Sequence, residues 1–239
     1  MTDPGAGRRA QTDGGDATFW SWLGPGARDA LVRAGRPVRH RSGEILLRAG
    51  ERSDHLVVVR SGCVKVVLDS STGHSAVLAL RGPGDLLGEQ AGIGGTTRSA
   101  TLQALTDVTC WTLPLAEFSR LQLAEAAIGA ALQRVLSERL READRMRAAA
   151  AEPVQNRLAA LLLELGARYG SERGDGEVRV RLPLSQDDLA GLVVSSRRTV
   201  SRVFEQWRQN GWVVTGRLEV RLLRVDVLRS LALTTGQPF

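Results

Sequence analysis

The sequence has almost no lysine. Lys65 is the only one, so all but one of the 32 lysine and arginine residues are arginine, and the formal net charge is +6. Arginine is suited to bidentate contact with phosphate groups and guanine edges. A GC-rich genome produces the same excess of arginine, so composition alone leaves nucleic-acid binding and codon bias both open.

Cysteine and histidine are also scarce. Two isolated thiols, Cys63 and Cys110, make neither a disulfide framework nor a cysteine-rich metal site. An iron–sulfur centre would need a cluster of about four cysteines. A haem would need an axial ligand, and the scattered His40, His55 and His74 are typical of structural histidines. We therefore expect no metal cofactor.

Long apolar runs are missing too. None approaches the roughly 18 residues of a membrane-spanning helix. The N-terminus has no apolar signal core, which indicates a cytoplasmic protein with no membrane partner. Residues 1–18 are rich in Gly, Asp and Arg, and we predict that they form a disordered tail.

The rest of the chain divides into three segments. Residues 19–114 contain short apolar stretches such as "EILLRAG" and "HLVVVRSGCVKVVL", separated by Gly, Asp and Ser, which is typical of a β-sandwich or barrel. Residues 115–152 are predicted to form a long helix and a hinge. Pro153 opens a second domain, 153–239, in which helices and short strands are mixed. The expected fold class is α+β.

The long helix carries an apolar stripe. Apolar residues from Ile128 to Met146 recur at spacings of three and four, so the stripe needs a partner surface. A second copy of the helix would make a coiled-coil seam and a homodimer. The alternative is a helix that lies along its own β domain.

A pair of helices is predicted between Leu184 and Val213. Ser185 is a candidate N-cap, and a short turn leads to a second helix that starts at Ser196. Between Ser195 and Arg229 there are eight arginines and three acids, a local net charge of +5. The pattern favours a helix-turn-helix that binds double-stranded DNA, followed by a hairpin wing. A solvated helix with a charged outer face is the alternative.

Three stretches resemble the CRP/FNR family of bacterial transcription regulators. They are "RSGEILLRAGERSDHLVVVRSGCVKVV", "GDLLGEQAGIGGTTRSATLQA" and "SSRRTVSR". The resemblance covers about residues 19–235. It implies an N-terminal cyclic-nucleotide-binding β-roll, a long dimerisation helix and a C-terminal winged helix-turn-helix.

The second of these stretches, which we call the cassette (residues 84–104), is similar to the family's phosphate-binding segment. The resemblance implies that Arg98 pairs with a cyclic phosphate, that Ser99 adds a hydroxyl or amide donor, and that Glu89 accepts from the ribose 2′-hydroxyl. Burying a phosphate charge is costly unless it is paired, which explains an arginine in this place. Gly88 and Gln90 complete the expected site, and the small Gly88 lets a ligand approach closely.

The chain departs from the cAMP-responsive members on the long helix. Those members hold adenine with a Thr-Ser pair, whereas the matching positions here are Ala143 and Asp144, with Glu142 one step earlier. The resemblance favours cAMP as the effector. It leaves cGMP, a cyclic dinucleotide or no ligand open.

The second helix of the pair resembles the family's recognition helix. Arg197 and Arg202 match its guanine-reading arginines, and Arg198 stands where a glutamate often reads cytosine, so we expect a palindromic operator that departs from TGTGA. Thr199 and Gln186 are expected to touch phosphate. Val194 lies in the turn, where glycine is common; a β-branched residue with a positive φ would be strained, so we expect a reshaped turn. The remaining candidate DNA contacts are Ser196 and Ser201.

The sequence therefore predicts an allosteric regulator, a homodimer gated by a cyclic nucleotide, with RNA polymerase as an implied partner. A ligand-independent regulator with a vestigial pocket is the alternative. An enzyme with a regulatory nucleotide domain is disfavoured, because no nucleophile–base arrangement follows residue 150 and the two domains leave no room for a catalytic one.

Overall fold

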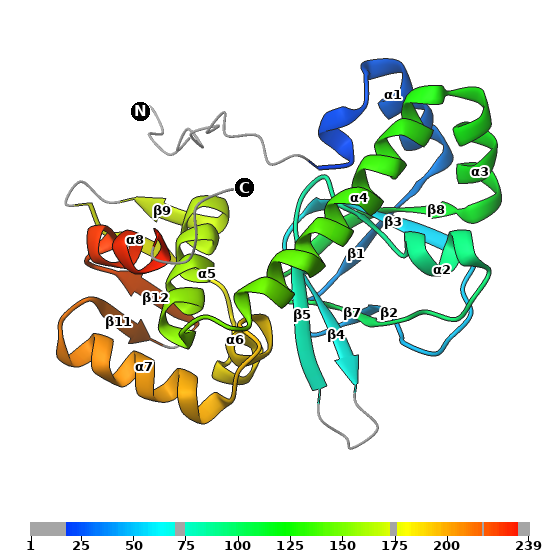
Figure 1. Cartoon of the computed structure of the whole chain (residues 1–239). Coiled ribbons are helices and arrows are strands. Elements are labelled where there is room, and N and C mark those ends of the chain that lie inside the picture. Colours follow the sequence, from blue (N-terminus) through cyan, green and yellow to red (C-terminus); the bar gives the residue numbers. More distant parts are fainter. Residues whose placement is uncertain (1–17, 70–74, 173–175, 217, 234–239) are drawn as a thin grey trace, which may run out of the picture.

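The computed structural model describes residues 18–69, 75–172, 176–216 and 218–233 (Figure 1). The expected disordered tail was residues 1–18, of which 1–17 lie outside the described residues. The described chain forms an N-terminal β domain and a C-terminal mixed domain, joined by a long helix. None of the helices in the described part is long and apolar enough to cross a membrane.

Two four-stranded antiparallel sheets make up the N-terminal domain. The first has the order β1-β8-β3-β6 and comprises β1 (Arg36–His40), β3 (His55–Ser61), β6 (Leu86–Leu87) and β8 (Val108–Pro114). The second has the order β2-β7-β4-β5 and comprises β2 (Ile45–Leu47), β4 (Val64–Asp69), β5 (Ser75–Arg81) and β7 (Thr101–Ala104). A tight turn joins β3 to β4 at Gly62, whose φ of 90° and closeness to the Asp107 carbonyl both exclude a side chain.

Short helices flank this domain. A 3₁₀ turn, η1 (Trp20–Trp22), and α1 (Pro25–Ala34) precede β1, while α2 (Glu89–Gly94) follows β6. The predicted long helix is in fact two helices, α3 (Leu115–Ala124) and α4 (Ala126–Ala149). They separate at Glu125, where the backbone is extended (φ −127°, ψ 96°).

The two halves of α4 have different surroundings. Ile128, Leu132 and Val135 are buried against η1, α1 and the first sheet, as the alternative of a helix along its own domain requires. Leu136 is 37% exposed and Leu140 is 63% exposed. The stripe is therefore covered by its own chain only in its first half, and its second half stays open.

The C-terminal domain packs helices around a second core. Its elements are α5 (Val154–Tyr169), β9 (Gly170–Glu172), β10 (Val178–Val180), α6 (Gln186–Leu192), α7 (Arg197–Gln209), β11 (Val213–Gly216), β12 (Glu219–Leu222) and α8 (Val225–Leu233). The strands form a sheet of order β11-β12-β10-β9. Phe204 and Trp207 of α7 are fully buried and meet edge to face, with ring centroids 6.1 Å apart.

The domains touch where α6 lies against the edge strand β5 (Figure 1). Lys65 Nζ on β4 is 3.1 Å from Asp188 Oδ1 on α6. The Cα of Gly191 lies against the backbone of Val77, so closely that a Cβ would be 2.8 Å from the Val77 nitrogen. One apolar cluster runs through this contact, from Val77 and Leu80 into the C-terminal core.

Candidate functional site

The cassette turns at Gly88, between β6 and α2. Its φ is 83°, in the left-handed region that favours glycine. A Cβ there would lie 2.8 Å from an Arg98 guanidinium nitrogen and 3.0 Å from Leu47. Glycine is therefore required both for the turn and for the close approach of Arg98.

The Arg98 side chain is buried, with 4% of its surface exposed. Its guanidinium donates to Ser53 Oγ at 2.6 Å, to the Ser53 carbonyl at 3.3 Å, and to the carbonyls of His55 and Gly88. Among the described residues, no carboxylate lies within ion-pair distance of it, and burial lowers the pKa of Arg98, opposed in part by the more distant charges of Glu89 and Asp54. A buried cation whose hydrogen-bond partners are all neutral is only partly compensated, so the residues fit an anion that would be bound there.

Glu89 is the acidic member of the site. It is buried, and desolvation raises the pKa of its carboxyl, opposed in part by the charges of Arg81 and Arg98. Arg139 Nε on α4 lies 3.7 Å from Glu89 Oε1. The carboxylate can accept a hydrogen bond from a ligand hydroxyl, and it stands among three arginines.

Gln90 and Ser99 come together beside this network. Ser99 Oγ donates to Gln90 Oε1 at 3.3 Å, and both residues are exposed. The structure thus brings all five predicted cassette residues into one region, but only Glu89 and Arg98 are buried.

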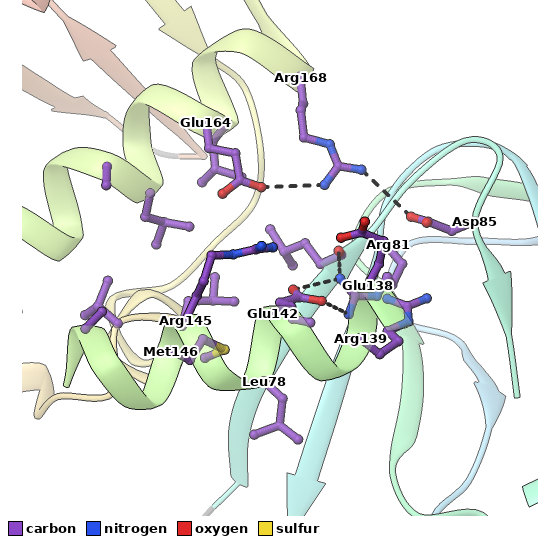
Figure 2. Close-up of a pocket in the computed structure, with 18 of the residues that line it drawn as sticks. Leu78, Arg81, Asp85, Glu138, Arg139, Glu142, Arg145, Met146, Glu164 and Arg168 are labelled. Atoms are coloured by element: carbon purple, nitrogen blue, oxygen red, sulfur yellow. Dashed lines mark hydrogen bonds and ion pairs between the residues drawn. The ribbon is translucent and has the colours of Figure 1, made fainter. Parts of the chain in front are cut away.

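The helix α4 turns different residues toward the cavity from those the sequence singled out. A cavity of about 630 Å³ lies between α4, β5 and α5, and its lining includes Arg81, Glu142 and Arg145 (Figure 2). Ala143 and Asp144 are not among the lining residues, and the exposed Asp144 pairs with Arg147 at 3.3 Å. The i, i+3 spacing of Arg139 and Glu142 was the signal that could have found this face.

Helix caps hold the predicted helix pair in place. Ser185 Oγ accepts from the Asp188 backbone N–H at 3.0 Å, and the Asp188 carboxylate accepts in return from Ser185 N–H, which completes a capping box. Ser196 caps α7 by accepting from the Thr199 N–H at 3.1 Å. Val194 in the turn has a φ of 49°, so the turn keeps the left-handed conformation at this position and the expected reshaping is not observed.

Arg157 of α5 supports that turn from behind. Its guanidinium donates to the Val193 carbonyl and, at 3.2 Å, to the Val194 carbonyl. A side chain from the start of the C-terminal domain therefore fixes a backbone conformation that is strained for a β-branched residue.

The first turns of α7 present an exposed basic face. Arg197, Arg198 and Arg202 are exposed, and Arg197 Nη1 lies 3.5 Å from Asp187 Oδ2 on α6. Ser201 Oγ donates to Gln186 Oε1, while Thr199 Oγ1 is 2.9 Å from Ser196 Oγ. Three guanidinium groups on one helix end can contact phosphates and base edges together.

The cysteines take no part in either region. Cys63 and Cys110 are buried, and burial raises the pKa of both thiols, that of Cys63 to about 11. In the part of the chain that the structure describes, no three His, Cys, Asp or Glu side chains are grouped so that they could hold a metal ion.

Known protein families match both the β domain that carries the cassette and the domain that carries the helix pair. Residues 37–124 match the cyclic nucleotide-binding domain, and residues 156–231 match the Crp-like helix-turn-helix domain. A CRP-like cAMP-activated global transcriptional regulator of Mycobacterium tuberculosis is 30% identical over 217 residues, which are 90% of this chain and 95% of that protein. The transcriptional activator protein FnrA of Stutzerimonas stutzeri is 29% identical over 86% of this chain and 83% of its own length.

Solved structures agree. A transcriptional regulator of the CRP/FNR family from Thermus thermophilus superposes with a TM-score of 0.69 at 29% identity, over 84% of this chain and all of that one. The chain belongs to the CRP/FNR family of DNA-binding transcription regulators and carries the family's cyclic-nucleotide-binding domain.

Proposed function

We propose that the protein is a homodimeric regulator that binds a palindromic operator and is gated by a cyclic nucleotide. The observation that carries the gating is Arg98, a buried guanidinium whose hydrogen-bond partners among the described residues are all neutral. A cyclic phosphate would supply a negative charge in direct contact with the guanidinium. Glu89 would accept from the ribose hydroxyl beside it.

The open half of the α4 stripe supports the homodimer. Leu136 and Leu140 are exposed at a spacing of four on one face, where a second copy of α4 would cover them. Leu136→Glu would place a charge in this seam. Light scattering at tens of micromolar should show a dimer for the wild type and a monomer for the variant, and a monomeric wild type would contradict the proposal.

The contact between α6 and β5 supports the coupling. The capping-box residue Asp188 pairs with Lys65 of the nucleotide-binding domain, so a shift of that domain reaches the DNA-binding helices. A ligand changes the equilibrium only if it binds one arrangement of the domains better than the other. RNA polymerase is the partner that the family membership implies for the DNA-bound dimer.

The resemblance and the M. tuberculosis relative favour cAMP as effector. For the DNA site, two copies of α7 related by a twofold axis should read half-sites about one helical turn apart. Arg198 donates and cannot accept from a cytosine amino group, so the half-site should differ from TGTGA at that base pair.

Selection from random duplexes, with and without effector, tests the proposal. We expect an inverted repeat that is enriched more strongly with the effector present. Failure to enrich any palindrome would overturn the DNA-binding proposal. Equal enrichment under both conditions would support a ligand-independent regulator instead.

A further inference from the structure

A second ionic cluster lies beyond Glu89, on the side of the cavity. Arg139, which contacts Glu89, also donates to the Leu86 carbonyl at 3.2 Å. Arg81 at the end of β5 makes two hydrogen bonds to Glu142, at 3.1 and 2.7 Å (Figure 2). Arg139 also lines the cavity together with Arg81 and Glu142, so it connects Glu89 to the side of the cavity on which that pair lies.

The pair lines the cavity instead of being sealed in the core. The Arg81 side chain is 11% exposed and that of Glu142 is 35% exposed. The cavity, about 630 Å³, is within the range of small-molecule sites. Arg81 keeps a further bond to the Leu80 carbonyl at 3.0 Å, so its position does not depend on Glu142 alone.

These two groups match the edges of one nucleobase. Guanine presents O6 and N7 as acceptors, which suit a guanidinium, and an N2 amino group with the neighbouring N1–H as donors, which suit a carboxylate. Adenine has one donor on this edge, its N6 amino group, beside the N1 acceptor, so it can give a carboxylate one hydrogen bond where guanine gives two. A bidentate contact with a carboxylate therefore favours guanine over adenine.

We propose that Arg81 and Glu142 make the nucleotide site selective for guanine. The inference rests on the proposed cyclic-nucleotide gating, and it departs from the cAMP that the resemblance favours. Glu89 and Arg98 do not line the cavity, but Arg139, which contacts Glu89, does; with the phosphate at Arg98 and the ribose at Glu89, the base would extend past Arg139 to the Arg81–Glu142 pair. Glu142, the more exposed partner, turns from Arg81 to the N1–H and N2 amino group, and Arg81 donates to O6 or N7.

Calorimetry on the full-length chain tests this with cyclic GMP, cyclic AMP and cyclic IMP. Cyclic GMP should bind about tenfold or more tightly than cyclic AMP, the scale of one good bidentate contact. Cyclic IMP lacks only the N2 amino group, so it should bind more weakly than cyclic GMP. Cyclic di-GMP against cyclic di-AMP shows whether the guanine belongs to a mononucleotide or a dinucleotide.

Variants locate the selectivity. Glu142→Gln should bring the affinities for cyclic GMP and cyclic AMP close together. Glu138→Gln is the control, because Glu138 lines the same cavity but pairs with Arg141 at 2.6 Å, and it should keep the preference. The wild-type comparison with cyclic IMP remains decisive if the Glu142 variant does not fold.

The outcomes separate this inference from the proposed function. Equal or tighter binding of the adenine nucleotides overturns guanine selectivity and leaves the gating intact. Binding of no cyclic nucleotide, with operator binding preserved, overturns the gating and the selectivity together. A guanine preference that survives Glu142→Gln overturns the assignment to this pair.

Discussion

Arg98 and the arginines of α7 carry the same guanidinium group in opposite surroundings. Arg98 is buried and donates hydrogen bonds to backbone carbonyls at fixed positions. In contrast, Arg197, Arg198 and Arg202 are exposed at one end of a helix. The first arrangement suits one small anion of defined shape. The second suits a long polyanion whose charges can be contacted in many ways. Composition counts both kinds alike, and only the fold separates their chemistry.

Salt should separate the two regions most strongly. A protein that neutralises about six DNA phosphates loses about a thousand-fold in affinity between 50 and 200 mM salt. The buried Arg98 is screened far less, so cyclic-nucleotide affinity should change little over the same range. Fluorescence anisotropy for DNA and calorimetry for the nucleotide measure both. If the affinities for DNA and for the cyclic nucleotide fell equally steeply with salt concentration, the two regions would not differ in the way described.

Removing the buried arginine should have the next largest effect. Arg98→Ala should weaken cyclic-nucleotide binding by about 2–4 kcal/mol, because the phosphate charge would be buried without a partner. Arg48→Ala is the matched control, since Arg48 is an exposed arginine of the same domain, 58% exposed and 3.6 Å from Glu51. Calorimetry that shows the same nucleotide affinity for Arg98→Ala and wild type would refute the cassette assignment.

An exposed arginine of α7 should matter less, but with sequence dependence. Arg197→Ala should cost about 1–3 kcal/mol on the best operator and relax discrimination at one base pair. Arg208→Ala, at the far end of α7 where Arg208 contacts Thr215 at 3.2 Å, should leave the sequence preference unchanged. Anisotropy on single-substituted operators measures this. A uniform loss on all sequences would place Arg197 on a phosphate instead.

The smallest effect is expected from Glu89, the buried carboxyl of the cassette, on the free energy of unfolding. Burial raises the folded-state pKa of Glu89, so its contribution to the free energy of unfolding is greatest below the ordinary glutamate pKa and is lost as the pH rises through the raised value. Glu89→Gln cannot ionise. The variant should gain stability relative to wild type as the pH rises from acid to neutral, as urea denaturation can measure. A difference that does not change with pH would show that Glu89 is not desolvated.

Local signals in the sequence predicted much of the DNA-binding unit. The Ser185 cap and the Ser196 start of α7 both depend on neighbouring residues, and the structure confirms them. The break at Glu125 was not predicted, because the apolar pattern continues across it. Strand β9 and helix α8 were missed for a related reason, since both are short and take their place from packing.

The cassette was predictable as a segment but not as a contact network. The acceptors around Arg98 are carbonyls of Ser53, His55 and Gly88, and backbone oxygens leave no mark in the sequence. On α4 one residue turns the side chain by about 100°, so the step from Ala143 to Glu142 decides what faces the cavity. Register of this kind depends on how α4 packs against η1 and the first sheet.

At Gly191 a single added methyl group would force α6 and β5 apart. Its Cα lies against the Val77 backbone, and a Cβ would be 2.8 Å from the Val77 nitrogen and 2.9 Å from its oxygen. Neither atom belongs to a flexible side chain that could move aside. Alanine at this position would therefore push α6 off β5 while leaving the cassette and α7 chemically intact. The spacing between the two domains is thus set by the absence of one carbon atom.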